Sequence, residues 1–373
     1  MAQKARYIMI GGFLGAGKTT SVLKLADHFS KQGKKVGLIT NDQGNALADT
    51  ALIRSHGFKV EEIAGGCFCC RFNSLTEAAE KLTLKSQPDV FIAEPVGSCT
   101  DLVATVSYPL RRIYGDDYSI APLSVVIDPI RASRILGIES GSSFSEKVAY
   151  IYRKQLEEAD LIIVNKIDLL KSGQINTLVN KLAETYVKAR ILTVSARNSE
   201  GLEEWFSNLS DNREMEAREV MNIDYDIYAE GEALLGWYNA SLTLKSNHEF
   251  DGNVFMKWIA DRLKAVLNEN QAEIAHLKMT LSPDLGLGDI ASINLVRNDY
   301  IPELSQTLEG PVKSGQVILN IRAEISPEVI HHCVERVIEE CSNQYPNIDA
   351  EIEHREYFQP GKPIPTHRMA AFS

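Results

Sequence analysis

The stretch from Gly12 to Thr20 combines residue types and spacing that suit phosphate binding. It reads Gly-Phe-Leu-Gly-Ala-Gly-Lys-Thr-Thr and fits the pattern G-x-x-x-x-G-K-[ST]. Glycines let the backbone approach a ligand closely, so that successive N–H groups and the start of a following helix face the phosphates. Lys18 would reach the β- and γ-phosphates, and the Thr19 hydroxyl would ligate Mg²⁺. The residues expected to bind the phosphates are Gly12, Gly15, Ala16, Gly17, Lys18, Thr19 and Thr20.

The flanking residues support this interpretation. Residues 7–10 are apolar and predict a buried strand, and residues 21–26 carry apolar side chains at helical spacing. The alternative is a glycine-rich turn that carries a lysine by chance. The strand–loop–helix context, which the phosphate-binding loop (P-loop) requires, argues against that alternative.

A second motif, at residues 165–168, indicates which base is bound. It reads Asn-Lys-Ile-Asp and follows an apolar run. The Asp168 carboxylate can accept hydrogen bonds from the guanine N1–H and exocyclic amine, whereas adenine would leave it unpaired at a cost. Ser195-Ala196, after the next strand, would approach the guanine O6 through a backbone N–H, although an ordinary strand-end turn explains this pair equally well. The residues expected around GTP or GDP are Asn165, Lys166, Asp168, Ser195 and Ala196.

Two carboxylates follow strands on the same side of the predicted sheet. Asp42 comes after the second strand and Glu94 after the third, close to where Mg²⁺ needs oxygen ligands. Together with Lys18 they are the expected catalytic residues, and Gly97 suits a loop that moves when a γ-phosphate is present. The alternative roles are helix capping by Asp42 and a strand-end charge at Glu94.

Three of the six cysteines, Cys67, Cys69 and Cys70, fall within four residues after Gly65-Gly66. Thiolates bind Zn²⁺, Cu(I) and similar ions, and the glycines can supply the turn that brings the three together. Three ligands leave a tetrahedral ion one position short, so the site is either open for transfer or completed by Cys99, a histidine or a second subunit. The alternatives are buried packing residues and a redox switch through Cys69 and Cys70.

Composition narrows the class of protein. The chain has 373 residues, 44% hydrophobic and 24% charged, with a net charge of −11. An acidic surface disfavours nucleic acid and anionic membrane as partners, and the sequence has no apolar run of the roughly 18 residues that a membrane span needs. We therefore expect a cytoplasmic globular protein with no nucleic-acid or membrane partner.

The order of apolar runs predicts two domains. Residues 1–210 alternate strand and helix patterns, which indicates an α/β domain with a doubly wound, mostly parallel sheet of the P-loop GTPase type. Residues 211–230 are charged and form a connector, and residues 231–373 predict a smaller α+β, ferredoxin-like domain with one extra strand. The strands expected in the first domain are 7–10, 35–40, 89–94, 122–128, 160–165 and 190–195.

These motifs together resemble the CobW-like GTPases, the metallochaperone branch of the SIMIBI class of P-loop proteins. The resemblance covers roughly residues 1–210. It rests on residues 11–20, Gly-Cys-Phe-Cys-Cys at 66–70, Glu94 with Gly97, and residues 165–168. It implies GTP hydrolysis coupled to delivery of a metal ion to a client metalloprotein. The implied cargo is Zn²⁺, or Co²⁺ or Ni²⁺ as in relatives, held by Cys67, Cys69 and Cys70, and a homodimer is a further expectation.

The chain departs from the pattern of that family in places. Asn41-Asp42-Gln43-Gly44 stands where the family has Asn-Glu-Phe-Gly, and Pro95 replaces a small hydroxyl residue. Residues 211–230 lack the histidines that many relatives carry there, and residues 231–373 show no clear match to the usual C-terminal domain.

Three other functions fit some of these features. One is a GTPase chaperone for a cobalamin- or metal-cofactor enzyme, without direct metal delivery. Another is a P-loop kinase of a small molecule, which residues 165–168 disfavour. The third is a metal-binding regulator that does not hydrolyse nucleotide.

Overall fold

The computed structural model describes residues 4–44, 48–210, 219–284 and 289–370, and these divide into two compact units. Unit 1 comprises residues 1–43, 58–229 and 362–373, and unit 2 comprises residues 44–57 and 230–361. The sequence pattern places a single boundary at 211–230, of which 211–218 lie outside the described residues. The units exchange two further short segments, because residues 44–57 fold with unit 2 and the C-terminal residues fold with unit 1.

Unit 1 is built on a parallel sheet. Its strands are β1 (Ala5–Gly11), β2 (Val36–Asn41), β3 (Val60–Ile63), β4 (Val90–Glu94), β5 (Tyr118–Ile120), β6 (Ser124–Ile127), β7 (Leu161–Val164) and β8 (Arg190–Thr193). They lie in the order β3-β2-β4-β1-β6-β7-β8, with β5 also paired to β1, and every pairing is parallel. The doubly wound parallel sheet expected from the sequence is therefore confirmed.

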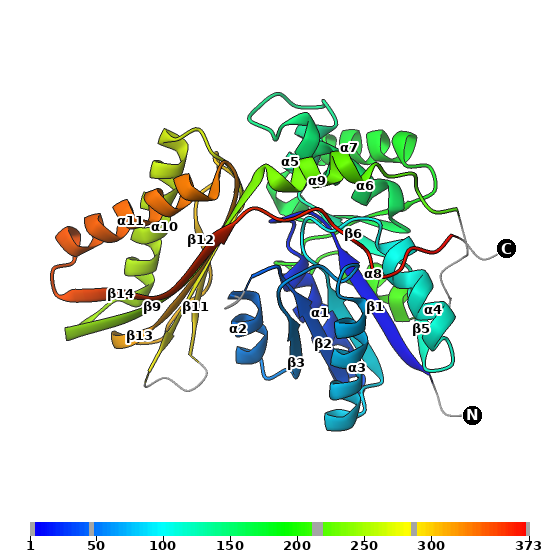
Figure 1. Ribbon diagram of the computed structural model, residues 1–373, viewed down its shortest axis with the longest axis horizontal. Coiled ribbons are helices and arrows are strands. Elements are labelled where there is room, and N and C mark those ends of the chain that lie inside the picture. The colour runs from blue at the N-terminus through cyan, green and yellow to red at the C-terminus, as the bar shows by residue number, and fades with distance from the viewer. Residues whose placement is uncertain (1–3, 45–47, 211–218, 285–288, 371–373) are drawn as a thin grey trace. The chain divides into compact units, whose positions relative to one another are not determined.

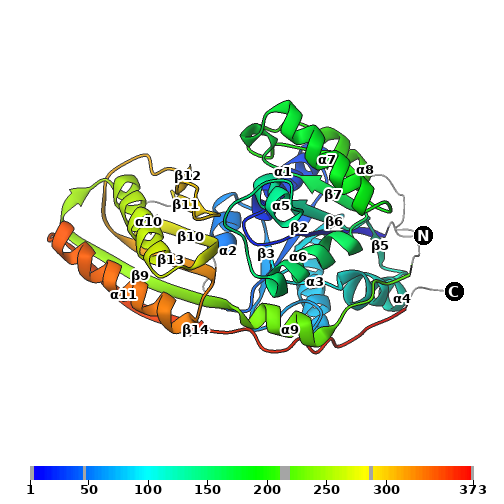
Figure 2. The same cartoon turned by 90° about the horizontal axis from the view of Figure 1, so that it is seen from above.

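Helices lie on both faces of this sheet (Figure 1 and Figure 2). Strands β4, β6 and β7 are buried along their whole length, and β1 and β2 at every residue but the first, which explains their continuous apolar sequences. The helices are α1 (Lys18–Lys31), α3 (Phe72–Ser86), α4 (Tyr108–Tyr114), α5 (Pro129–Ile135), α6 (Glu146–Glu158), α7 (Ser172–Thr185) and α8 (Leu202–Ser210), while α9 (Tyr225–Ala233) runs across the boundary between the units.

The carboxyl ends of the strands form one edge of the sheet, where parallel α/β sheets bind their ligands. The loop after β1 lies where the chain turns from β1 towards β2 on one side and β6 on the other. The loops after β2, β4, β7 and β8 open at the same edge, so the five loops that carry the predicted site residues start side by side.

Unit 2 is an antiparallel sheet with helices. Its elements are α2 (Ala48–Ser55), β9 (Leu235–Phe250), α10 (Gly252–Glu269), β10 (Glu273–Pro283), β11 (Ala291–Leu295), β12 (Glu303–Gln306), β13 (Val312–Glu324), α11 (Pro327–Gln344) and β14 (Ile348–Phe358). The strand order is β12-β11-β10-β13-β9-β14. Strands β14, β9, β13 and β10 with α10 and α11 form the expected ferredoxin-like core, which β11 and β12 extend by two strands. Strand β12 has no expected counterpart in the sequence pattern.

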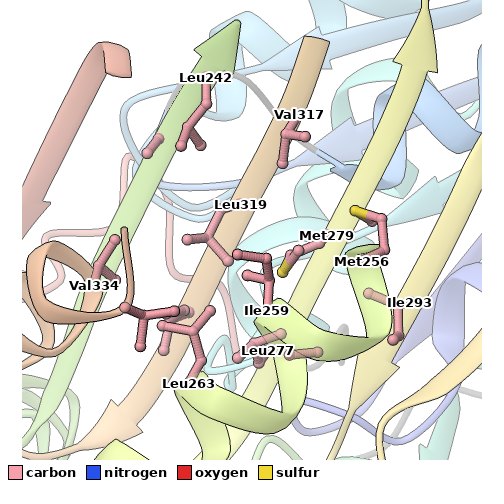
Figure 3. Packing of buried hydrophobic residues seen from close by; sticks show 14 of the residues in the cluster. Leu242, Met256, Ile259, Leu263, Leu277, Met279, Ile293, Val317, Leu319 and Val334 are labelled. Carbon is pink, nitrogen blue, oxygen red and sulfur yellow. The ribbon is translucent and has the colours of Figure 1, made fainter. Parts of the chain in front are cut away.

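Helices α10 and α11 begin where their capping residues predict. The Asp251 carboxylate accepts from the N–H groups of Asn253 and Val254 at 2.8 and 3.0 Å. The Ser326 hydroxyl accepts from Val329 N–H at 3.4 Å, with Pro327 in the first turn. Both helices bury apolar side chains against the sheet, and Figure 3 shows those of α10 facing β9, β10 and β13.

Helix α2 packs on β10 and β13, although in the chain it lies between β2 and β3 of unit 1. Asp49 pairs with Lys278 Nζ at 2.5 Å, and Ala48 N–H donates to Asn320 Oδ1 at 2.9 Å. The fully buried Ile53 adds apolar contact. These contacts explain why residues 44–57 belong to unit 2.

Within the described residues, no helix has both the length and the apolar character needed to cross a membrane.

From the packing of the unit 2 core, we expect two substitutions on α10 to differ in their effect on the free energy of unfolding. Leu263 is 1% exposed and Val254 is 57% exposed. Leu263→Ala leaves a cavity and should lower the free energy of unfolding of this unit by about 2–5 kcal/mol. Val254→Ala, the control on the same helix, should change it by less than about 0.5 kcal/mol. Urea unfolding followed by circular dichroism measures both, and equal effects would contradict the packing in Figure 3.

Candidate functional site

The loop between β1 and α1 has a backbone that only glycine can adopt. Gly12, Gly15 and Gly17 have φ angles of 128°, 76° and 96°. A Cβ on Gly12 would lie 2.1 Å from the Val126 carbonyl oxygen, and one on Gly17 would lie 2.4 Å from Asn165 Nδ2. The loop is therefore pressed against β6 and against the motif after β7, and its shape requires glycine at these positions.

Lys18 and Thr19 begin α1 directly after this loop. Both are buried, and Lys18 Nζ lies 3.4 Å from the Phe13 carbonyl oxygen, so the ammonium group turns back over the loop. The Thr19 hydroxyl donates to Glu94 Oε1 at 3.0 Å. The structure thus brings Thr19 together with Glu94, although they are 75 residues apart in the chain.

Asp42 lies at the same edge of the sheet. Thr40 pairs with Glu94 in the register between β2 and β4, and Asp42 follows two residues later. Its backbone N–H donates to the Ile63 carbonyl at 3.1 Å, which continues the pairing of β2 with β3. The oxygens of Thr19, Asp42 and Glu94 have the hard-donor chemistry that suits Mg²⁺.

Asn165 joins three loops. Its Nδ2 donates to the Ala16 carbonyl at 3.0 Å, and its Oδ1 accepts from Ala196 N–H at 3.0 Å. The P-loop, the 165–168 motif and the Ser195-Ala196 turn are therefore held as one assembly. The sequence predicts contact of Asn165 with a nucleotide, and the structure adds this bridging role.

Asp168 is oriented by a serine from the neighbouring strand end. The Ser195 hydroxyl donates to Asp168 Oδ1 at 2.5 Å and accepts from Asn198 N–H at 3.2 Å. The side chain of Ser195, and not only the backbone of its turn, thus fixes the carboxylate. A carboxylate held by a hydroxyl keeps further lone pairs for a ligand.

Lys166 lies against the P-loop. Its backbone is left-handed, with a φ of 57°, and its Nζ donates to the Gly15 carbonyl at 2.7 Å and pairs with Asp128 Oδ2 at 3.0 Å. Asp128 Oδ1 also caps α5 by accepting from Ile130 and Arg131 N–H. Asp128 is a site residue that the sequence reasoning missed, because the Asp-Pro pair signals a helix start but not its lysine partner.

Arg131 was missed as well. Its Nη1 donates to the Leu14 carbonyl at 2.8 Å, and its guanidinium lies 4.8 Å from the centroid of the Phe144 ring. This buried arginine therefore stabilises the P-loop backbone at Leu14. No local sequence pattern distinguishes it from a surface arginine of a short helix.

The three clustered cysteines converge in a turn. Cys67 carbonyl accepts from Cys70 N–H at 3.1 Å and from Arg71 N–H at 2.9 Å, and Gly65 and Gly66 before it have φ angles of 75° and 152°. The Sγ atom of Cys67 lies 2.7 Å from the Sγ atom of Cys69 and 3.2 Å from the Sγ atom of Cys70. The three sulfurs all lie within 4.8 Å of one another, which is the arrangement a single metal ion needs.

The thiols perturb one another's protonation. Hydrogen bonds from Cys69 and Cys70 lower the pKa of the Cys67 thiol well below its usual value. Hydrogen bonds with Cys67 and Cys70 raise the pKa of Cys69, and the hydrogen bond with Cys67 raises the pKa of Cys70 to about 11. Hydrogen bonding within the group therefore favours one thiolate among the three cysteines, and a metal ion has to displace the protons that remain.

Asn41 connects this turn to β2. Its Nδ2 donates to the Ile63 carbonyl at 3.0 Å and to the Gly66 carbonyl at 2.6 Å. Asn41 directly precedes Asp42, so the cysteine turn and the loop with the predicted Mg²⁺ ligand share one anchor. The sequence contained Asn41 next to the predicted Asp42, but its side-chain partners lie 22 and 25 residues away.

The C-terminal segment 362–370 runs across the cysteine turn. Ile364 N–H points at Cys70 Sγ at 3.3 Å, and Thr366 N–H donates to the Cys69 carbonyl at 2.8 Å. Arg368 pairs with the buried Asp101 carboxylate at 2.8 Å, and His367 packs edge-on against Phe72 rather than joining the sulfurs. The sequence pattern does not predict that residues 362–370 lie over the cysteine turn.

The positive φ angle of Gly17 and its close approach to Asn165 lead to a prediction about nucleotide affinity. Gly17→Ala places a Cβ against Asn165 and should lower nucleotide affinity by at least about tenfold, since the three joined loops have to separate. Gly33→Ala is the matched control, because Gly33 also has a positive φ of 77° but no atom within 4 Å of a Cβ. Titration with a fluorescent GDP analogue measures both variants. Equal affinities would show that the close approach to Asn165 is not required.

The cover over the cysteines makes a second prediction. Ending the chain after Gly361 removes the contacts of Ile364 and Thr366, so alkylation of Cys70 by iodoacetamide should accelerate by about fivefold or more, as expected for loss of local protection. The buried Cys341 of unit 2 is an internal control, and mass spectrometry distinguishes the two sites. An unchanged rate at Cys70 would mean that the segment does not shield it.

Comparisons with known proteins can be set against this geometry. The chain is 33% identical over 164 residues to "Zinc chaperone YeiR" of Escherichia coli (strain K12), an alignment that covers 43% of this chain and 46% of that protein. It is 25% identical over 251 residues to "Zinc chaperone CobW" of Sinorhizobium sp, covering 58% of this chain and 69% of that protein. The alignments thus span a little under half of the first relative and just over two thirds of the second.

A solved structure of "Zn(II)-bound YjiA GTPase from E. coli" aligns with 90% of this chain and 99% of that one, at 16% identity and a TM-score of 0.40. This likeness is too low to bear on function.

The sequence model of the CobW/HypB/UreG nucleotide-binding domain matches residues 6–193, which is half of the chain. The matched region contains the P-loop, the cysteine turn and the 165–168 motif described above. The chain belongs to the CobW/HypB/UreG family.

Proposed function

We propose that this protein hydrolyses GTP and binds Zn²⁺ at Cys67, Cys69 and Cys70, for delivery to a client metalloprotein. The observation that carries the proposal is the convergence of three sulfurs within 4.8 Å, in a turn that Asn41 anchors beside the nucleotide loops. The zinc chaperones among its relatives support the choice of metal.

The donor set suits a metal that is carried rather than stored. Three thiolates bind Zn²⁺ well but leave one tetrahedral position for another ligand, whereas closed structural sites use four. A thiolate or imidazole of the client can enter at that position before the first ligands leave. Burial of Cys67 and Cys69, at 4% and 1% exposure, keeps competing ligands in solution away.

Guanine selectivity is assigned to Asp168. The carboxylate that Ser195 holds at 2.5 Å would accept both the guanine N1–H and its exocyclic amine. Adenine presents no such pair of donors, so it would forgo the two hydrogen bonds that guanine makes with this carboxylate. The stem of Lys166, whose Nζ is held over the P-loop, would pack against the base.

Hydrolysis on this geometry relies on charge and position. Phosphoryl transfer requires an in-line water and neutralised phosphate charge more than covalent chemistry. Lys18 and the N–H groups of the P-loop neutralise the phosphates, and Thr19, Asp42 and Glu94 are the residues that would hold Mg²⁺ and its waters. The Mg²⁺ ion, when bound, would neutralise charge between the β- and γ-phosphates. The rate is expected to be slow and set by loop movement.

Nucleotide and metal would act on each other through short connections. Asp42 adjoins Asn41, which holds the cysteine turn, and Glu94 begins the loop that leads to Cys99. If the γ-phosphate shifts these loops, metal affinity changes, and by linkage the metal changes nucleotide affinity by the same factor. A homodimer would offer another source for the missing ligand.

A competition experiment tests this proposal. Zn²⁺ affinity is measured against a chromophoric chelator, under reducing conditions, with GTP·Mg²⁺, GDP·Mg²⁺ and no nucleotide. We expect affinity to differ about tenfold between nucleotide states, or 1.4 kcal/mol of coupling, and to be lost in a Cys67/Cys69/Cys70→Ser variant. Lys18→Ala should abolish GTP turnover, and ATP should not replace GTP.

Other results would point elsewhere. Metal affinity that ignores the nucleotide would favour a GTPase chaperone for a metal- or cobalamin-cofactor enzyme. GTP turnover equal to that of Lys18→Ala would favour a metal-binding regulator, and a preference for ATP would favour a kinase.

A further inference from the structure

A fourth cysteine lies next to the cluster but comes from another part of the chain. Cys99 belongs to the loop after β4, 29 residues beyond Cys70. Its thiol is a hydrogen-bonding neighbour of both Cys67 and Cys69, and Cys99 is only 1% exposed. It stands outside the group of three whose sulfurs lie within 4.8 Å of one another, so it borders the cluster without being part of its turn.

The backbone around Cys99 is fixed. Its N–H donates to the Val96 carbonyl at 2.9 Å, and its carbonyl accepts from Gln155 Nε2 at 2.8 Å. Gln155 Nε2 also donates to the Gly97 carbonyl at 2.9 Å. One side chain of α6 therefore holds the backbone of both Gly97 and Cys99, separately from the glycines that shape the turn at Cys67.

Tetrahedral coordination of zinc requires the cysteine sulfurs to lie slightly farther apart than they do in this structure. Four thiolates at 2.3 Å from a tetrahedral ion lie about 3.8 Å from one another. The sulfurs of Cys67, Cys69 and Cys70 are 2.7 to 3.7 Å apart, so an ion among them would spread them slightly. Cys99, which neighbours both Cys67 and Cys69, is the cysteine from another loop that such a rearrangement could bring into the ligand set.

We propose that Cys99 is the fourth ligand of the metal, and that it closes the site into four thiolates. This inference rests on the proposed function. It selects one source for the missing ligand among those the three-cysteine motif leaves open. His367, the histidine of the nearby C-terminal segment, packs on Phe72 at a centroid distance of 5.0 Å and takes no part.

The position of Cys99 in the chain also links this proposed ligand to the nucleotide loops. Its loop starts at Glu94, which accepts from the Thr19 hydroxyl, and a Cβ on Gly97 would lie 2.6 Å from Leu14 of the P-loop. A γ-phosphate that displaces Gly97 would therefore carry Cys99 with it. The nucleotide then controls one of four metal ligands, which separates a closed holding state from an open state ready for transfer.

X-ray absorption on the wild-type protein tests the ligand count without any substitution. Zinc-loaded protein is measured with no nucleotide, with GDP·Mg²⁺ and with GTP·Mg²⁺. We expect four sulfur neighbours at about 2.3 Å in at least one state and three in another. Three or fewer sulfurs in all three states would overturn the inference, whether a nitrogen, water or a second subunit takes the fourth position.

Substitution tests the coupling. Cys99→Ala should weaken Zn²⁺ binding and reduce the roughly tenfold nucleotide effect to less than about twofold. Cys341→Ala, which removes a buried thiol of unit 2, is the matched control and should leave both unchanged. Circular dichroism shows whether each variant is folded. Equal affinity and equal nucleotide dependence in the two variants would overturn the role of Cys99.

The two proposals fail in different ways. If the Cys67/Cys69/Cys70→Ser variant still binds Zn²⁺ like the wild type, the proposed function is wrong and Cys99 has no site to complete. If that variant loses Zn²⁺ while Cys99→Ala matches Cys341→Ala, the proposed function stands and only the fourth ligand is wrong.

Discussion

The side-chain amide of Asn41 holds together the parts of unit 1 on which the rest of the candidate site depends. Its two hydrogen bonds, to the carbonyls of Ile63 and Gly66, fix the start of the cysteine turn to the end of β2. Asp42 follows Asn41 directly, so the loop that begins there and the cysteine turn share one point of attachment. The proposed Mg²⁺ ligand and the proposed metal-binding turn are thus joined through one residue, and the coupling we propose needs no long path of side chains.

Two short segments, residues 44–57 and 362–373, fold with the unit that does not contain their neighbours in the sequence. The chain leaves unit 1 just after Asp42, and α2 then folds on the sheet of unit 2 through Asp49, Ile53 and their partners. The C-terminal segment returns to unit 1 and crosses the cysteine turn. Each unit therefore contains a segment whose neighbours in the sequence belong to the other unit.

Sequence reasoning succeeded where the physics is local. Buried parallel strands need continuous apolar runs, a phosphate-binding loop needs its glycines, and Ser326-Pro327 starts a helix, so each of these was predicted and lies where expected. The short strands β3, β5 and β12 are only partly buried, and the sequence pattern did not predict them. The contacts of Lys166 with Asp128, of Ile364 with Cys70 and of α2 with β10 join distant positions. Nothing in the local pattern of either partner specifies such pairs.

A metal carrier has to satisfy two opposed demands, tight binding and release. Four thiolates hold Zn²⁺ too firmly for rapid exchange, and three exposed thiolates would lose it to any competing ligand in solution. Burial of Cys67 and Cys69 under the C-terminal segment addresses the second demand. A fourth ligand on a separate loop addresses the first, since the loop can withdraw one sulfur while the turn keeps three. The fourth ligand that we propose, Cys99, lies in the loop that begins at Glu94 and contains Gly97, so a movement of that loop with the nucleotide would act on this sulfur first.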